Sequence, residues 1–284
     1  MWQYNPKTDT WTQKANLPAS ARWSAVAFSL GNFGYYGTGT NLDSCFSDFW
    51  QYDPNIDEWT RIADFPRKQF ESVEFVIGSE GYVGLGINLE LTYYNEFWKY
   101  QPTSDSWIPI ATLPSAGRKH AKAEAVGNSA IIAGGQSKFE YHSDCWKYSS
   151  FNDTWKEISP LPTTPIRGMS SFKIETHVYF INGLDSNLTK HKAVWRYEIK
   201  NDIFSNPLMI YPNPSSGIVN VDLNRLNQPK VKLSVYDLTG KLLKNHTIES
   251  DYIQLNCTNF QPGAYLFLFQ TANTSFYKKV ILTR

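Results

Sequence analysis

Three arginines recur near the start of a repeated segment, and their chemistry suits the binding of carboxylates or sugar hydroxyl groups. Arg22, Arg118 and Arg167 take equivalent places in the repeat, and Phe70 takes the fourth place. A guanidinium group offers a planar fork of N–H donors that matches the geometry of a carboxylate. Adjacent positions add an indole ring, a carboxylate and an imidazole. The predicted ligand-binding residues are therefore Arg22, Trp23, Glu71, Arg118, His120 and Arg167.

A structural interpretation of these arginines stays open, in which each one binds backbone carbonyl groups of a neighbouring repeat. The segments that differ most among the repeats are residues 41–46, 88–94 and 137–143. Variable loops on a repeated scaffold are the expected place for specificity.

Residue types that perform catalysis are sparse in this chain. The three cysteines do not have the spacing of metal ligands, so we expect free or individually buried thiols. No Gly-x-Ser-x-Gly nucleophile elbow supports Ser-His-Asp chemistry. The sequence therefore predicts no catalytic residues, no metal and no cofactor. The histidines and cysteines are His120, His142, His177, His191, His246, Cys45, Cys145 and Cys257.

The elements that must position the arginines are short strands in a repeat of nearly constant length. The pattern Trp-x-Tyr-x-x-x-x-Asp-x-Trp begins at Trp2, Trp50, Trp98 and Trp146, with a fainter copy at Trp195. Two more apolar runs and a Gly-rich break lie between successive copies, which gives four strands per period. A repeat of this length without helical periodicity is typical of a β-propeller. Each repeated indole is expected to pack between neighbouring blades.

These residues resemble the kelch family of β-propellers over about residues 1–205. The resemblance depends on a Gly pair, a Tyr and a Trp in the usual kelch order, although only Gly134-Gly135 is a strict pair. It implies blades around an axis, with the arginines lining a central funnel. The predicted fold class is all-β: a kelch-type propeller of four full blades plus a half blade in residues 1–206, followed by a small antiparallel β-sandwich in residues 207–284.

The first repeat is incomplete. Five copies of the Trp-x-Tyr hairpin are preceded by only four inner pairs of strands, because Met1 begins in the outer half of a blade. No basic segment or apolar core of a signal peptide follows Met1. We therefore expect a truncated chain, the C-terminal part of a longer protein. A five-bladed ring that lacks two strands is the alternative.

The kelch resemblance also implies enzymatic alternatives to a binding role. Galactose oxidase has similar blades but uses two His, two Tyr and a Cys joined to one Tyr around copper, and only Tyr141-His142 with Cys145 matches this superficially. Sialic acid mutarotases are kelch propellers whose chemistry needs only a few placed polar groups. We predict a noncatalytic module that binds a glycan or a protein, with an extracellular carbohydrate-active enzyme as the alternative.

The sequence changes character near Asn206-Pro207, where the tryptophans and the repeat both end. Alternating apolar residues then indicate about seven strands of a small antiparallel sandwich. This tail resembles the C-terminal sorting domain of type IX secretion, found in Bacteroidota. The resemblance implies that the export machinery recognises the folded tail and delivers the protein to the cell surface or the extracellular space. The matching residues are Tyr211, Pro212, Asn213, Pro214, Gly217, Asp237, Gly240, Pro262, Gly263, Tyr265, Lys278 and Lys279.

Charge and hydropathy argue against two classes of partner. Lys and Arg total 27 while Asp and Glu total 26, so the chain has no basic surplus that would predict nucleic-acid binding. No run of 18 apolar residues predicts a transmembrane helix. The expected partners are the type IX secretion machinery, through residues 207–284, and an unknown extracellular glycan or protein ligand.

Overall fold

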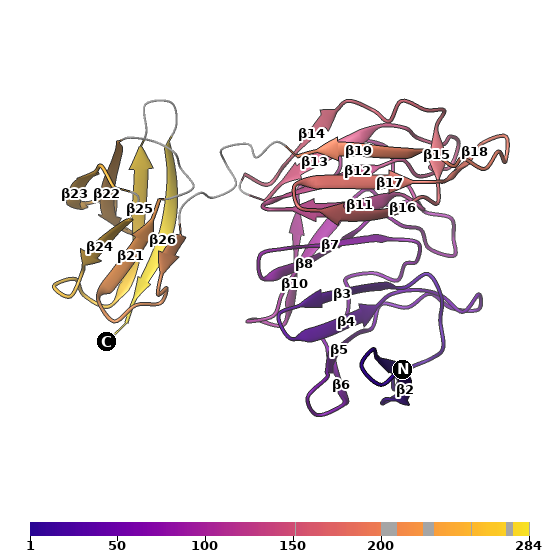
Figure 1. The fold of residues 1–284 in the computed structure, drawn as a ribbon, viewed down its shortest axis with the longest axis horizontal. Helices are drawn as coiled ribbons and strands as arrows, with labels where there is room; N and C mark the ends of the chain where they lie inside the picture. The colour runs from indigo at the N-terminus through magenta and orange to yellow at the C-terminus, as the bar shows by residue number, and fades with distance from the viewer. Residues whose placement is uncertain (151, 200–208, 224–229, 251, 271–274, 284) are drawn as a thin grey trace. The chain divides into compact units, whose positions relative to one another are not determined.

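The computed structural model describes residues 1–150, 152–199, 209–223, 230–250, 252–270 and 275–283. These residues form strands, turns and loops, with no helix among them (Figure 1). The chain divides into two compact units, Met1–Asn201 and Asp202–Arg284. The all-β fold predicted from the sequence is confirmed, while the predicted domain boundary between residues 206 and 207 lies outside the described residues.

Three complete blades form most of the first unit, and each is an antiparallel sheet of four strands in chain order. Blade I contains β3 (Val26–Leu30), β4 (Phe33–Gly37), β5 (Phe49–Asp53) and β6 (Glu58–Ile62). Blade II contains β7 (Val73–Ile77), β8 (Glu80–Gly84), β9 (Phe97–Gln101) and β10 (Ser106–Ile110). Blade III contains β11 (Lys122–Val126), β12 (Ser129–Ala133), β13 (Cys145–Ser149) and β14 (Thr154–Ile158).

The remaining strands of this unit form smaller sheets. Blade IV contains β16 (Ser170–Ile174), β17 (His177–Ile181) and β19 (Val194–Glu198), and its predicted closing strand near Phe204 lies outside the described residues. The predicted half blade is the hairpin of β1 (Trp2–Asn5) and β2 (Thr10–Gln13). A short pair joins β15 (Ile166–Arg167) to β18 (Leu184–Asp185). The four inner strands β3, β7, β11 and β16 contact one another in that order.

Close backbone contacts join each blade to the next near the inner strands. Gly39 N donates to the backbone oxygen of Gln69 in the next blade at 2.8 Å. Only glycine suits this approach, because φ of Gly39 is +94° and a Cβ would lie 2.9 Å from the Trp23 oxygen. The same bond joins Gly86 to Arg118 at 2.8 Å and Gly135 to Ile166 at 2.9 Å.

The repeated Trp, Tyr and Asp residues link the outer strands of neighbouring blades. In blade III, Trp155 Nε1 donates to the Ala111 oxygen at 2.7 Å, and Asp153 Oδ1 accepts from Ala111 N at 2.9 Å. Tyr148 OH donates a hydrogen bond to the same Asp153 oxygen at 2.9 Å. We call this set the interblade clamp. Clamps with the same bonds in blades I and II join Tyr52, Asp57 and Trp59 to Ala15, and Tyr100, Asp105 and Trp107 to Ala63.

The hairpin β1–β2 differs from the clamped blades. Its two indoles, Trp2 and Trp11, are 60% and 64% exposed. Asp9 accepts a hydrogen bond from Tyr4 OH at 2.9 Å, and the equivalent Asp of each clamped blade accepts the same bond from the Tyr of its own hairpin. The expectation that every repeated indole is packed between blades is therefore wrong for this copy.

The second unit is a sandwich of two antiparallel sheets. One sheet contains β21 (Ile218–Asp222) between β20 (Met209–Tyr211) and β24 (Tyr252–Asn256). The other has the order β23 (Leu242–Ile248), β22 (Val231–Asp237), β25 (Gly263–Gln270) and β26 (Ser275–Leu282). Alternate residues of these strands form one buried core, which includes Val219, Val235, Leu255, Phe267 and Val280.

Candidate functional site

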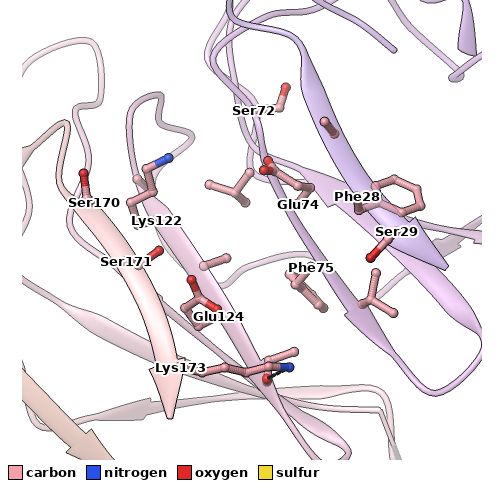
Figure 2. A pocket seen from close by; sticks show the side chains of 16 residues that line it. Phe28, Ser29, Ser72, Glu74, Phe75, Lys122, Glu124, Ser170, Ser171 and Lys173 are labelled. Carbon is pink, nitrogen blue, oxygen red and sulfur yellow. Dashed lines mark hydrogen bonds between the residues drawn. The ribbon is translucent and has the colours of Figure 1, made fainter. Parts of the chain in front are cut away.

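A cavity of about 600 Å³ lies where the inner strands of the four blades meet. Its walls come from β3, β7, β11 and β16, so all four blades contribute to it. Figure 2 shows Glu74 of β7 and Glu124 of β11 directed into the space between the strands. We call it the central cavity. Its polar lining is Ser29, Ser72, Glu74, Lys122, Glu124, Ser170, Ser171 and Lys173.

Glu74 is the titratable group of this cavity whose environment is most unusual. Burial is the main cause that raises its pKa to about 7, and the nearby Glu124 carboxylate raises it further. Lys122 opposes both effects because its positive charge favours the ionised form. A carboxyl group that titrates near neutral pH can both accept and donate a proton under physiological conditions. No sequence motif indicates Glu74, because its raised pKa depends on burial and on residues of β11 that approach β7 only in the fold.

Lys173 reaches from blade IV to the neighbouring inner strand of blade III. Its Nζ donates to the Ala125 oxygen of β11 at 3.1 Å, and Figure 2 shows the side chain extending from its own strand toward the adjacent one. This bond ties β16 of blade IV to blade III. It also places a positive charge in the wall of the central cavity.

One end of the cavity begins at Ser72 and Ala121, and the residues just before them form a charged cluster. Glu71 Oε2 lies 3.0 Å from Lys119 Nζ and 3.1 Å from His120 Nε2. The Glu71 side chain is only 6% exposed. We call Glu71, Lys119 and His120 the mouth cluster. The structure thus brings together two predicted site residues, Glu71 and His120, and adds Lys119.

The backbone at the mouth cluster adopts an uncommon conformation. Glu71 has φ of 56° and His120 has φ of 55°, and the corresponding Ser24 and Gly168 have φ of 51° and 66°. Positive φ in residues other than glycine carries strain and is enriched at functional sites. Gly168 N donates to the His120 oxygen at 3.0 Å, which joins blade IV to blade III at this point.

The charges around His120 act against its protonation. Burial is the main cause that lowers the pKa of His120, while the Glu71 carboxylate opposes it. Lys119, Arg167 and Lys122 lower this pKa further because each is positively charged. Positive charge at this end of the cavity comes from the lysines and the arginine.

Arg22 and Arg118 are held by protein groups. The Arg118 side chain is fully buried and forms a bidentate pair with Asp144, and it also donates to the Gly134 oxygen. The Arg22 side chain is 1% exposed and pairs with Asp48 in the same way. These contacts are structural, but they differ from the structural interpretation, because the acceptors are a carboxylate and a backbone carbonyl group of the same blade and not carbonyl groups of a neighbouring repeat. Ligand binding by Arg22 or Arg118 stays a prediction.

The predicted equivalence of the three arginines is wrong in register. The bridges Trp23–Thr40, Phe70–Ile87 and Lys119–Gln136 correspond to the pair Arg167–Leu184, so Arg167 lies one position later than Arg22 and Arg118. The cause is loop length. Four residues separate the bridged Thr40 and Cys45, but five separate Ile87 and Tyr93, and five separate Leu184 and Lys190. The constant Trp spacing of the outer strands therefore does not hold for the inner strands. The last predicted residue, Trp23, is 47% exposed.

The second unit uses its predicted sorting residues to fasten the start of the domain to its last strand. Asn213 donates to the Lys279 oxygen at 3.0 Å and accepts from Ile281 N at 2.8 Å. Gly217 has φ of 126°, and a Cβ there would lie 2.8 Å from Thr258 Cγ2. Pro212 and Pro214 flank Asn213 and follow cis peptide bonds, and Tyr211 is 41% exposed.

The remaining sorting residues lie at two turns and on the last strand. Asp237 Oδ1 accepts from the backbone N–H groups of Thr239 and Lys241, and Gly240 takes φ of 86° in this turn. Tyr265 OH donates to the Gln261 oxygen at 2.5 Å, across the turn that contains Pro262 and Gly263. Burial lowers the pKa of Lys278, whereas the next residue, Lys279, is exposed.

The cysteines, metal ligands and membrane spans give three further results. Cys45, Cys145 and Cys257 are free and buried. Within the described ranges, no group of three His, Cys, Asp or Glu side chains could hold a metal ion. A search of the same ranges for a helix long and apolar enough to cross a membrane found none.

Three comparisons with known proteins place the chain. Residues 209–283 match the family described as the secretion system C-terminal sorting domain. The solved structure of YjhT aligns with a TM-score of 0.58 at 12% identity, over 95% of this chain and 87% of YjhT, which shows a shared fold. An endo-acting ulvan lyase from Formosa agariphila is 29% identical over 110 residues, 38% of this chain. That match spans 21% of the length of the lyase.

These comparisons contradict the prediction that the protein is not an enzyme. The finding that overturns it is the curated relative, which carries the name of a lyase, whereas the similarity to YjhT shows the propeller fold alone. The prediction relied on missing nucleophile and metal motifs, whereas acid–base chemistry needs only placed carboxylates such as Glu74. The sorting domain implies interaction with the secretion machinery and export to the cell surface or the extracellular space. The chain is an all-β protein in which a β-propeller precedes a type IX secretion sorting domain.

Proposed function

We propose that this protein is an exported carbohydrate-active enzyme that interconverts the anomers of a sugar in its central cavity. The observation that carries the proposal is Glu74, a cavity carboxyl group whose pKa is raised to about 7. Glu124 supplies a second carboxylate in the same cavity. A carboxyl group that titrates near neutral pH, with a second carboxyl group in the same cavity, can supply paired acid and base roles.

Mutarotation fits these groups because it needs proton transfer and no other reagent. A carboxylate takes the proton from the anomeric hydroxyl group while a carboxylic acid gives a proton to the ring oxygen. The bond between the anomeric carbon and the ring oxygen breaks, and a carbonyl group forms. Rotation and ring closure by the reverse steps return both protons and give the other anomer. We assign the acid role to protonated Glu74 and the base role to Glu124.

A sugar is the substrate class that the cavity and the comparisons support best. A cavity of about 600 Å³ is of the size that holds a small saccharide. Its four serines and two lysines offer hydrogen-bond partners for several hydroxyl groups. Kelch propellers include sialic acid mutarotases, and the curated relative is named for a lyase that acts on ulvan. Export would bring this cavity into contact with extracellular glycans.

The test is anomer exchange measured by NMR saturation transfer on reducing sugars, with Glu74→Gln and Glu124→Gln. Removing one acid–base group is expected to lower the rate about 10²-fold or more. The matched control is Glu58→Gln, because Glu58 is an exposed carboxylate on β6 outside the cavity. Exchange at the wild-type rate in Glu74→Gln would contradict the proposal.

The name of the curated relative favours elimination as a second candidate. Elimination also needs a base and an acid, so the same two glutamates would serve. The same variants are therefore to be incubated with uronate-containing polysaccharides, and the unsaturated product measured by its ultraviolet absorbance. Product formation that depends on Glu74, without anomer exchange, would favour this reaction over mutarotation.

A further inference from the structure

Arg167 differs from Arg22 and Arg118 because no carboxylate group in the described part of the chain lies beside it. Asp48, Glu96 and Asp144 precede the third strands of blades I to III, and each pairs with an arginine of its own blade. The equivalent residue of blade IV is Ala193, whose oxygen accepts from Asn182 N as the oxygen of Asp48 accepts from Thr38 N. In blade IV, Ile166 therefore stands at the register position of Arg118 and Ala193 at that of Asp144, and Arg167 follows one position later without that acid.

A tyrosine fixes the Arg167 side chain. Arg167 Nε donates to Tyr141 OH at 2.7 Å, and the guanidinium carbon lies 5.3 Å from the centre of the Tyr141 ring. Both side chains are half-buried. The bond uses one of five N–H donors, and it orients the fork without neutralising its charge. Among the described residues, no carboxylate lies within ion-pair distance of Arg167.

Arg167 lies beside the mouth cluster. It takes the same register position in blade IV as Lys119 takes in blade III, and the Gly168–His120 backbone bond joins these two segments. Its charge is close enough to lower the pKa of His120. Lys119 is already paired with Glu71 at 3.0 Å. The mouth therefore presents an oriented, unneutralised guanidinium next to the His120 imidazole.

We propose that Arg167 binds the carboxylate of an acidic sugar, so that the substrates of the central cavity are uronates or similar sugar acids. The inference rests on the proposed function, whose substrate class it narrows. A free guanidinium fork matches a carboxylate bidentately, as Arg118 already does with Asp144 in blade III.

The test uses three pairs of sugars, and in each pair one sugar carries a carboxylate where the other carries a hydroxymethyl group. The pairs are glucuronate and glucose, galacturonate and galactose, and mannuronate and mannose. Binding to the full chain is measured by titration calorimetry. At least one acid is expected to bind ten times more tightly than its neutral partner. Arg167→Ala should reduce the ratio of acid affinity to neutral-sugar affinity at least tenfold. The control Arg196→Ala changes an exposed arginine on β19 of the same blade and should leave this ratio unchanged.

Tyr141→Phe distinguishes orientation from charge, because it removes only the acceptor of the Arg167 Nε bond. It is expected to weaken acid binding about threefold to tenfold and to leave neutral-sugar binding unchanged. Thermal unfolding of each variant shows whether the fold is intact. Equal binding of acids and neutral sugars, no binding of any acid, or a full acid preference in a folded Arg167→Ala would each overturn the proposal.

A failure of this inference can be told from a failure of the proposed function. If the preference for acidic sugars depends on Arg167 but neither anomer exchange nor elimination occurs, the anion site is supported and the enzymatic function is contradicted. If the turnover of neutral sugars depends on Glu74 and is unchanged in Arg167→Ala, the enzymatic function is supported and the anion site is contradicted.

Discussion

At the scale of single residues, register and a neighbouring acid together decide what an arginine does. Asp144 fixes Arg118 in blade III, whereas Arg167 lies one register position later in blade IV, where Ala193 replaces the acid. In blade II the acid is Glu96, and its longer side chain reaches Arg67 at 3.1 Å. Trp98 Nε1 then has no hydrogen-bond partner among the described residues, although Trp50 and Trp146 donate to the aspartates of their blades. The sequence showed the arginines, but their partners depend on the register of the fold.

The first prediction concerns the buried ion pair. Asp144→Ala leaves the Arg118 guanidinium buried without a counter-charge, so it should reduce the free energy of unfolding by about 3 to 5 kcal/mol. The equivalent Glu96→Ala should cost less than about 1 kcal/mol, because that side chain is 45% exposed. Denaturant unfolding of both variants measures the difference. Equal losses would show that burial of Arg118 does not govern this pair.

The second prediction concerns Glu74 and pH. Its folded-state pKa of about 7 is above the usual 4.5, so the folded chain binds the proton more tightly than the unfolded chain. The stability from this group is present below pH 4.5 and is lost as the pH rises to about 7. Glu74→Gln has no carboxyl group to ionise, so it does not lose this stability as the pH rises. The variant should be about 1 to 3 kcal/mol more stable than wild type at pH 8.

Unfolding of both proteins at pH 4 and pH 8 provides the comparison for Glu74. The advantage of Glu74→Gln should be small at pH 4 and full at pH 8. An advantage that is independent of pH would mean that the carboxyl group is not perturbed in the fold.

At the scale of elements, the interblade clamp explains why Trp, Tyr and Asp recur with the blades. Each clamp joins an outer hairpin to the segment that leaves the preceding blade, so the repeat length of the outer strands is constrained. The loops of residues 41–44 and 88–92 lie outside the clamp and differ in length by one residue. Strands and blades could therefore be predicted from the spacing of the tryptophans. The register of the inner strands, which line the cavity, could not.

The third prediction isolates the clamp. Asp153→Ala removes the acceptor of both Tyr148 OH and Ala111 N, and it should cost about 1 to 3 kcal/mol. Asp9→Ala is the matched control, because Asp9 has a similar φ and accepts from Tyr4 OH on the exposed hairpin. It should cost less than about 1 kcal/mol. Thermal unfolding checks both values, and a comparable loss in Asp9→Ala would contradict a clamp between blades.

At the scale of the whole molecule, the chain combines a catalytic candidate with a sorting domain that folds around its own core. The tail was the part most completely predicted from sequence, because its motifs are local and lie in the expected order. Asn213 shows what sequence could not give: its side chain joins the start of the domain to β26. The central cavity was missed for a related reason, since each of its walls comes from a different blade.

The fourth prediction is that deletion of residues 209–283 stops export in a type IX secreting bacterium. The protein should remain inside the cell envelope, because the machinery has no sorting domain to recognise. Fractionation followed by immunodetection measures its location. Arg196→Ala in the full chain is the control and should be exported normally. Undiminished export of the deletion variant would contradict a sorting role for the tail.

The fold makes Glu74 an acid–base group at neutral pH, and a combined titration of its carboxyl group and of the reaction rate measures this. The ¹³C chemical shift of the Glu74 carboxyl group is followed with pH, in parallel with the rate of anomer exchange, and Glu74→Gln identifies the signal. We expect both curves to share an apparent pKa of about 7. A Glu74 carboxyl that titrates near 4.5, or an exchange rate that does not follow its titration, would contradict the claim.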